Sequence, residues 1–195
     1  MNNIKYLFFN RFKIFALVTV SMLLSIVLLM IRMKLTHSFF YLFLVWNLFL
    51  AVIPFTLTSY LVSLPKLNKI VFVLWFGIWL LFLPNAPYIV TDLIHLRLNE
   101  GSFLWLDILV VSSFVFNGLL LFYLSLVDMK NQLKNHLNKS LTNYIITSIL
   151  FLSGFGVYLG RFLRYNSWEI ISNPKYLFVD IINIALKPFT KNFAL

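Results

Sequence analysis

Asp92 and His95 are the two residues whose types and spacing best suit chemistry in this sequence. They follow Pro84 and Pro87, which end an apolar run of nearly membrane length. On a helix, residues three apart lie on one face, so both side chains can reach a single substrate atom. A carboxylate can orient an imidazole, and an imidazole is well suited to move protons near neutral pH. We therefore predict that Asp92 and His95 form a catalytic acid–base pair.

Tyr88 and Asn99 extend this pair into a polar stripe, because steps of four, three and four residues stay on one helical face. Polar groups at the edge of hydrocarbon are costly and mark functional sites. An amphipathic helix lying on the outer leaflet explains the same pattern. As a metal site the pair supplies two ligands where zinc needs three or four, so we predict no metal and no cofactor.

Arg161 and Arg164 form a second candidate group, one helical turn apart after another apolar run. Two guanidiniums at a membrane surface suit a phosphate or carboxylate group. We predict an anion clamp or ion pairs with Asp92 or Asp107, with snorkelling to lipid head groups as the alternative. The predicted substrate-binding residues are the polar groups expected at the same membrane edge: Asn47, Asn85, Tyr88, Asp107, Arg161, Arg164 and Glu169.

The composition requires that these groups be positioned by membrane-spanning helices. Of the 195 residues, 61% are hydrophobic and only 11% are charged, whereas soluble domains carry about a quarter charged residues. We therefore predict an all-α, polytopic transmembrane helical bundle formed by one integral membrane domain, residues 1–195. Five apolar runs suit a bilayer: Ile14–Ile31, Phe39–Leu64, Ile70–Leu83, Leu104–Val127 and Leu141–Gly160.

Two segments do not fit a simple span. The run Ile70–Leu83 has only 14 residues, so it must tilt, end early or continue into the broken outer helix after Pro84. Tyr176–Leu186 reads as a helix of eleven residues, too short to cross a bilayer. We expect this C-terminal helix to be interfacial or re-entrant.

Charge indicates both the orientation and the partners. Eight Lys and Arg residues lie in the N-terminus and the two connections on its side, against three in the opposite connections, which predicts a cytoplasmic N-terminus. The connection Asp128–Ser140 is then a turn to which we assign no chemistry. The net charge of +10 lies beside apolar runs, which predicts membrane lipids as partners and no nucleic acid.

When the five spans cross the membrane in alternating directions, the candidate residues lie on the outer side. We therefore expect them to share one outward-facing polar pocket.

Gly156 and Gly160 lie four residues apart, which allows another helix to approach closely. They are therefore a candidate surface for a membrane-protein partner. The sequence has no cysteine, which excludes thiolate chemistry.

Two segments carry a family resemblance. The stretches Leu83–Leu96 and Gly160–Glu169, together with Trp46–Phe55, resemble predicted bacterial integral membrane proteins catalogued as domain of unknown function 1361. The resemblance implies a bacterial cytoplasmic membrane protein and supplies no activity. It also implies one more apolar segment than this chain has, which leaves a shortened version open.

Three functions fit these residues, and they leave open whether the chain is an enzyme. The first is binding or processing of an envelope lipid or a lipid-linked anionic substrate by the polar pocket. The second is a non-catalytic assembly or partner-binding role, in which the polar groups form an internal network. The third is transport of a small solute, which broken helices favour slightly.

Overall fold

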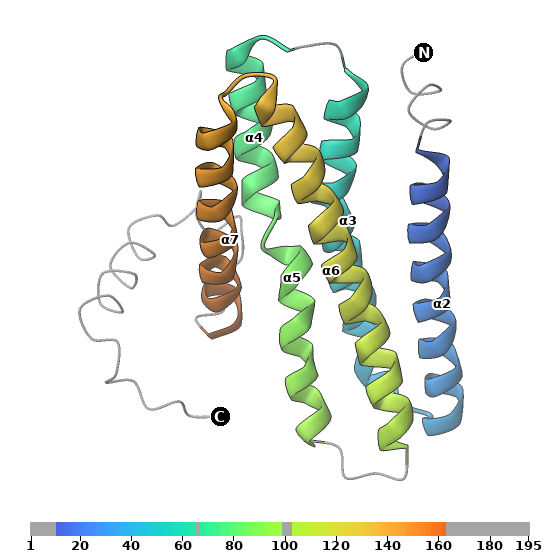
Figure 1. Cartoon of the computed structure of the whole chain (residues 1–195). Coiled ribbons are helices and arrows are strands. Elements are labelled where there is room, and N and C mark those ends of the chain that lie inside the picture. Colours follow the sequence, from blue (N-terminus) through green and yellow to red (C-terminus); the bar gives the residue numbers. More distant parts are fainter. Residues whose placement is uncertain (1–10, 65–66, 99–102, 163–195) are drawn as a thin grey trace, which may run out of the picture.

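The computed structural model describes residues 11–64, 67–98 and 103–162, which form a bundle of helices that run alternately up and down (Figure 1). Long apolar runs form helices here because a helix satisfies every backbone polar group within its own segment. In chain order the elements are α2 (Phe12–Thr36), η1 (Phe40–Leu42), α3 (Phe43–Ser63), α4 (Lys69–Phe82), α5 (Asn85–Tyr88), η2 (Ile89–Leu98), α6 (Leu104–Lys134) and α7 (Lys139–Phe162).

Within this described part, five helical segments are long and apolar enough to cross a membrane. They confirm the predicted all-α bundle of a multi-pass membrane protein. Their bounds are Phe12–Thr36, Phe40–Ser63, Lys69–Leu96, Leu104–Lys134 and Lys139–Arg161. The predicted helix Tyr176–Leu186 lies outside the described residues.

The third span continues through its proline-rich break. Leu83, which precedes Pro84, still donates its N–H to the Trp79 carbonyl at 2.9 Å, and Tyr88 donates to the Pro84 carbonyl at 3.1 Å. The chain therefore keeps a helical path from α4 through α5 into η2. Figure 1 shows this lower half of the span running beside α6, so it packs in the bundle instead of lying along a membrane surface.

Two glycines make the close packing of this break possible. A Cβ added at Gly118 of α6 would lie 2.7 Å from the Ala86 carbonyl oxygen, and one added at Gly156 of α7 would lie 2.7 Å from Cγ of Pro84. Neither neighbour is the end of a flexible side chain. The break is therefore held between α6 and α7, which fixes where η2 begins.

Helix α6 is central and packs against α2, α3 and η2. Its buried Val110 and Phe114 belong to an apolar core that includes Leu44 of α3. A polar contact adds to this packing: Asn117 donates to the Ser25 hydroxyl of α2 at 2.9 Å, which links α6 to α2.

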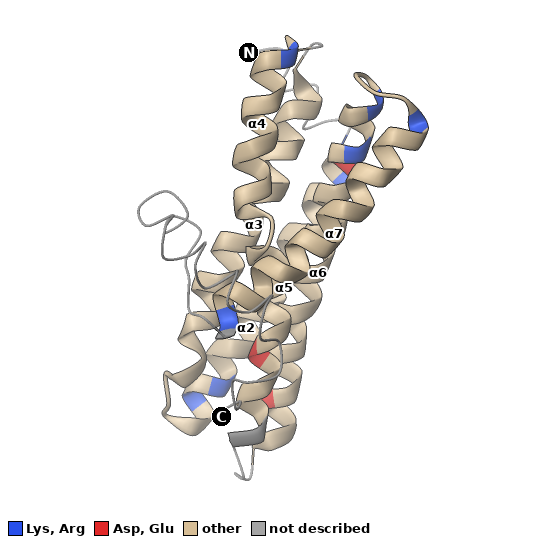
Figure 2. Ribbon diagram, turned by 90° about the vertical axis from the view of Figure 1, so that its left-hand side faces the viewer, with Lys and Arg blue, Asp and Glu red and all other residues tan. Residues whose placement is uncertain are grey.

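An ion pair lies at the end of the bundle where α2 begins, called here the N-terminal end. Arg11 donates two hydrogen bonds to the carboxylate of Asp128 on α6. This bonding raises the pKa of the Arg11 guanidinium, which therefore keeps its charge. Figure 2 shows red for acidic residues amid several blue basic positions at this end.

Candidate functional site

Four polar side chains from three spans meet toward the opposite end of the bundle. Asn47 comes from α3, Asp92 and His95 come from η2, and Arg161 comes from the last turns of α7. We call these four residues the Asp92 cluster. All four were predicted as site residues, and the structure brings them into contact.

Asp92 lies at the centre of the cluster and is 1% exposed. One carboxylate oxygen, Oδ2, accepts a hydrogen bond from Nδ2 of Asn47 at 2.8 Å. The other, Oδ1, lies 3.6 Å from Nη1 of Arg161. A buried carboxylate needs such partners, because an unpaired charge away from water is strongly unfavourable. Asn47 and Arg161 therefore make a charged Asp92 tolerable at this depth.

His95 joins the cluster through Arg161. Its Nε2 lies 3.3 Å from Nη2 of Arg161, and a guanidinium has only N–H donors, so Nε2 is the acceptor. A neutral His95 then carries its proton on Nδ1. This atom is buried and has no hydrogen-bond partner among the described residues.

Two phenylalanines fix the His95 ring on its other sides. The ring centroids of Phe40 and Phe43 lie 5.8 Å and 5.2 Å from that of His95, both at steep interplanar angles. Neither phenylalanine was predicted to belong to the site. Aromatic residues are so frequent in this chain that neither stood out from the lipid-facing ones.

The geometry of η2 explains which residues share the face of Asp92. Residues 89–98 form a 3₁₀ helix, in which positions three apart are eclipsed. Asp92 is therefore aligned with His95 and with Ile89, which is fully buried. The predicted stripe assumed an α-helix and so included Tyr88 and Asn99. Tyr88 belongs to α5 and is half-buried, while Asn99 lies outside the described residues.

Asp107 occupies a second ion pair. Nε of Arg32 on α2 donates to its Oδ1 at 2.8 Å, and both side chains are 5% exposed. Arg32 also donates to the Ser38 carbonyl at 3.1 Å and lies 4.6 Å above the ring of Tyr41. Arg32 is one of the three Lys and Arg residues in the opposite connections, which served only to predict orientation. The position of Arg32 near the end of the first span and of Asp107 near the start of the fourth span could have indicated this ion pair.

The other predicted site residues have separate positions. Asn85 donates from Nδ2 to the Phe82 carbonyl at 3.0 Å, which satisfies a backbone acceptor at the end of α4. Arg164 and Glu169 lie outside the described residues. Gly156, predicted with Gly160 as a partner surface, packs against Pro84 of the same chain.

The described residues contain no group of three or more His, Cys, Asp or Glu side chains that could hold a metal ion. What they offer is a carboxylate, a guanidinium, an imidazole and an amide within one network. Such a set can bind an anion through Arg161 and donate a hydrogen bond through Nδ1–H of His95.

Comparison with known proteins gives one match. The model of the family described as "Protein of unknown function (DUF1361)" matches residues 46–194, which is most of the chain and includes every residue of the Asp92 cluster. No curated protein and no solved structure matches the chain.

Proposed function

We propose that this chain, which belongs to the DUF1361 family of proteins of unknown function, binds or processes an anionic lipid or a lipid-linked anionic substrate at the Asp92 cluster. One observation carries the proposal. The guanidinium of Arg161 contacts both Asp92 and His95, and its side chain remains 19% exposed. A cation that is held in place and still reaches the surface is suited to receive an anion.

The depth of the cluster favours a lipid-type ligand. Asp92 lies four residues before the end of the span Lys69–Leu96, which in a 3₁₀ helix corresponds to about 8 Å. This is the depth at which lipid head groups meet acyl chains. A phosphate or carboxylate at that depth can accept two N–H donors from one guanidinium, which suits Arg161 better than a lysine.

His95 is the better placed group for proton transfer. Its Nδ1 has no described partner, whereas both oxygens of Asp92 have one. In this arrangement Asp92 holds Arg161, Arg161 fixes the tautomer of His95, and Nδ1–H of His95 donates a hydrogen bond to the substrate. His95 accepts a proton only at Nε2, once an anionic substrate has taken over the donor of Arg161. Asp92 remains a candidate for catalysis because it is joined to His95 through Arg161.

The proposed location is the bacterial cytoplasmic membrane with a cytoplasmic N-terminus. The distribution of Lys and Arg supports this orientation, which places the Asp92 cluster toward the outer surface. The ligand would then be a component of the cell envelope.

Lipid retention tests the proposal directly. The full chain is purified gently in detergent, supplied with phosphatidylglycerol or phosphatidylcholine, and examined by native mass spectrometry. We expect R161Q to lose at least half of the retained phosphatidylglycerol, and R161K to be intermediate because it keeps the charge without the fork of donors. K34Q is the matched control, because Lys34 is an exposed cation in the last turn of α2, away from the N-terminal end.

Equal loss of phosphatidylglycerol in R161Q and K34Q would contradict the proposal, because it would show attraction by general charge. Equal retention of phosphatidylcholine and phosphatidylglycerol by the unaltered chain would contradict it as well. If R161Q fails to accumulate, the comparison of R161K with K34Q still decides.

A further inference from the structure

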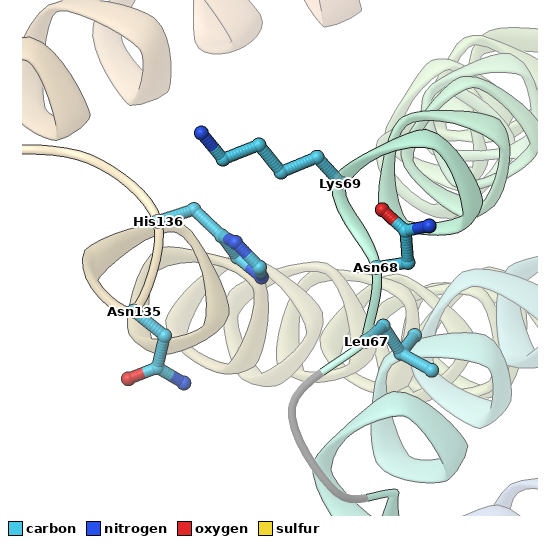
Figure 3. A pocket seen from close by; sticks show the side chains of 5 residues that line it. All are labelled: Leu67, Asn68, Lys69, Asn135 and His136. Carbon is cyan, nitrogen blue, oxygen red and sulfur yellow. The ribbon is translucent and has the colours of Figure 1, made fainter.

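A second polar region lies at the N-terminal end, in a hollow of about 610 Å³ between the start of α4 and the turn after α6. Figure 3 shows its lining, which consists of Leu67, Asn68, Lys69, Asn135 and His136. These residues belong to connections between spans or to the first residue of a span. The hollow therefore lies at a membrane surface, at the level of lipid head groups.

Lys69 and His136 approach the hollow from its two sides. In Figure 3 the Lys69 side chain extends from α4 toward the turn after α6, while the His136 ring extends in the opposite direction toward α4. The His136 ring stacks on Phe72, with centroids 4.6 Å apart and planes at 26°. This stacking holds the imidazole in place, so the pair presents an ammonium group and a positioned ring N–H.

The surrounding charge is positive. The lining contains no acidic side chain, and Asp128, the acid of this end in the described chain, is bound by Arg11. Four lysines of the same end are exposed, one each on α2, α4, α6 and α7: Lys13, Lys69, Lys134 and Lys139. Their charges remain available to an anion from solution or from the membrane surface.

We infer that this hollow binds a phosphate group, either as the head group of an anionic phospholipid or as a free ion. Lys69 and His136 donate hydrogen bonds to its oxygens, and the neighbouring lysines contribute long-range attraction. The site is separate from the Asp92 cluster, since the two lie toward opposite ends of the bundle. Its existence does not depend on the proposed function.

Chemical labelling of histidine tests the inference in the full chain. Diethylpyrocarbonate modifies accessible imidazoles, and mass spectrometry follows each site. Inorganic phosphate and phosphatidylglycerol are added in separate experiments. We expect a phosphate group to slow modification of His136 several-fold and to leave that of exposed His37 unchanged. K69Q is expected to raise the concentration for half-protection about fivefold, because one basic side chain near an anionic lipid surface contributes a factor of about that size.

K13Q is the matched control, since Lys13 is an exposed cation of the same end that does not line the hollow. If inorganic phosphate protects His136 and phosphatidylglycerol does not, the ligand is a free ion. If phosphatidylglycerol protects His136 and inorganic phosphate does not, the ligand is a lipid head group. Either result supports the inference. Absence of protection with both, or equal weakening by K69Q and K13Q, overturns it. Because Lys69 and Lys13 are exposed, neither substitution removes a packed side chain.

Discussion

Arg161 contacts two side chains, Asp92 and His95, and each interacts with a different property of its guanidinium. Asp92 needs a positive charge nearby because its carboxylate is buried, and His95 needs a donor at Nε2. A lysine would supply the charge from a single point, whereas a guanidinium presents two nitrogens to two acceptors at once. The identity of this residue as arginine therefore matters for the geometry of the whole cluster.

A double-mutant cycle measures the coupling between Asp92 and Arg161. We expect D92N and R161Q each to destabilise the protein, with a coupling free energy of about 1 to 2 kcal/mol, because either change alone leaves a partner unpaired. Unfolding in detergent is followed by circular dichroism. The control cycle pairs D92N with R11Q at the N-terminal end, where the effects should add to within about 0.5 kcal/mol. Absence of coupling between Asp92 and Arg161 would remove the basis for a shared site.

The sequence allowed the residues of this cluster to be proposed, because polar groups are rare in apolar runs and each one is conspicuous. It did not determine their partners. Arg32 and Arg161 are both cations near the ends of spans, and Asp92 and Asp107 are both acids near the same membrane edge. Which cation meets which acid depends on how α2 and α7 are rotated against η2 and α6, and that is set by packing across the bundle.

The broken third span depends on two glycines that act on opposite sides of it. Gly118 accommodates the backbone of Ala86, and Gly156 accommodates the ring of Pro84. A larger residue at either position would push the break away from α6 or α7. Since η2 starts directly after this break, such a shift would also move Asp92 and His95.

Alanine substitutions test this packing with internal controls. G156A and G118A should destabilise the protein by about 1 to 3 kcal/mol, because overpacking against backbone or a proline ring cannot relax easily. G154A and G77A, with no atom within 4 Å of the added Cβ, should be neutral or stabilising by up to about 1 kcal/mol. Thermal unfolding in detergent provides the measurement. If G154A and G156A behaved alike on α7, the close contact with Pro84 would not be important.

At the scale of elements, the spans were predictable and the type of helix after the break was not. Apolar length identified all five spans, since only hydrocarbon-matched segments contain so few charges. The α6 helix runs to Lys134, seven residues beyond the predicted Val127, because a helix can project past the apolar region. Residues 89–98 form a 3₁₀ helix that packs against α6 and α3, and the spacing of polar residues in the sequence predicted an α-helix there instead.

Considered as a whole, the bundle has two polar ends that differ in charge. The N-terminal end carries mostly lysines, and the opposite end carries the two ion pairs Arg32–Asp107 and Arg161–Asp92. This asymmetry is the basis of the proposed orientation, in which the lysine-rich end lies in the cytoplasm. The two candidate sites would then face different compartments.

Cysteine labelling tests the orientation, and the natural chain has no cysteine to interfere. Single variants K13C and K34C place a thiol at each end of α2, both at exposed positions. In intact cells we expect a membrane-impermeant maleimide to label K34C and not K13C. Permeabilised cells should allow both to be labelled, which controls for reactivity. The reverse pattern in intact cells would show that the Asp92 cluster lies toward the cytoplasm.

The position of Asp92 in the third span has a consequence for biogenesis. Spans of a membrane protein enter the bilayer in the order of synthesis, so Asn47 of α3 is already present when η2 arrives, whereas Arg161 of α7 follows two spans later. Until then Asp92 has Asn47 as its described partner and lacks Arg161, which makes insertion of this segment less favourable. The last described span, α7, therefore supplies the guanidinium of Arg161. This guanidinium pairs with the Asp92 carboxylate that entered the membrane with the third span.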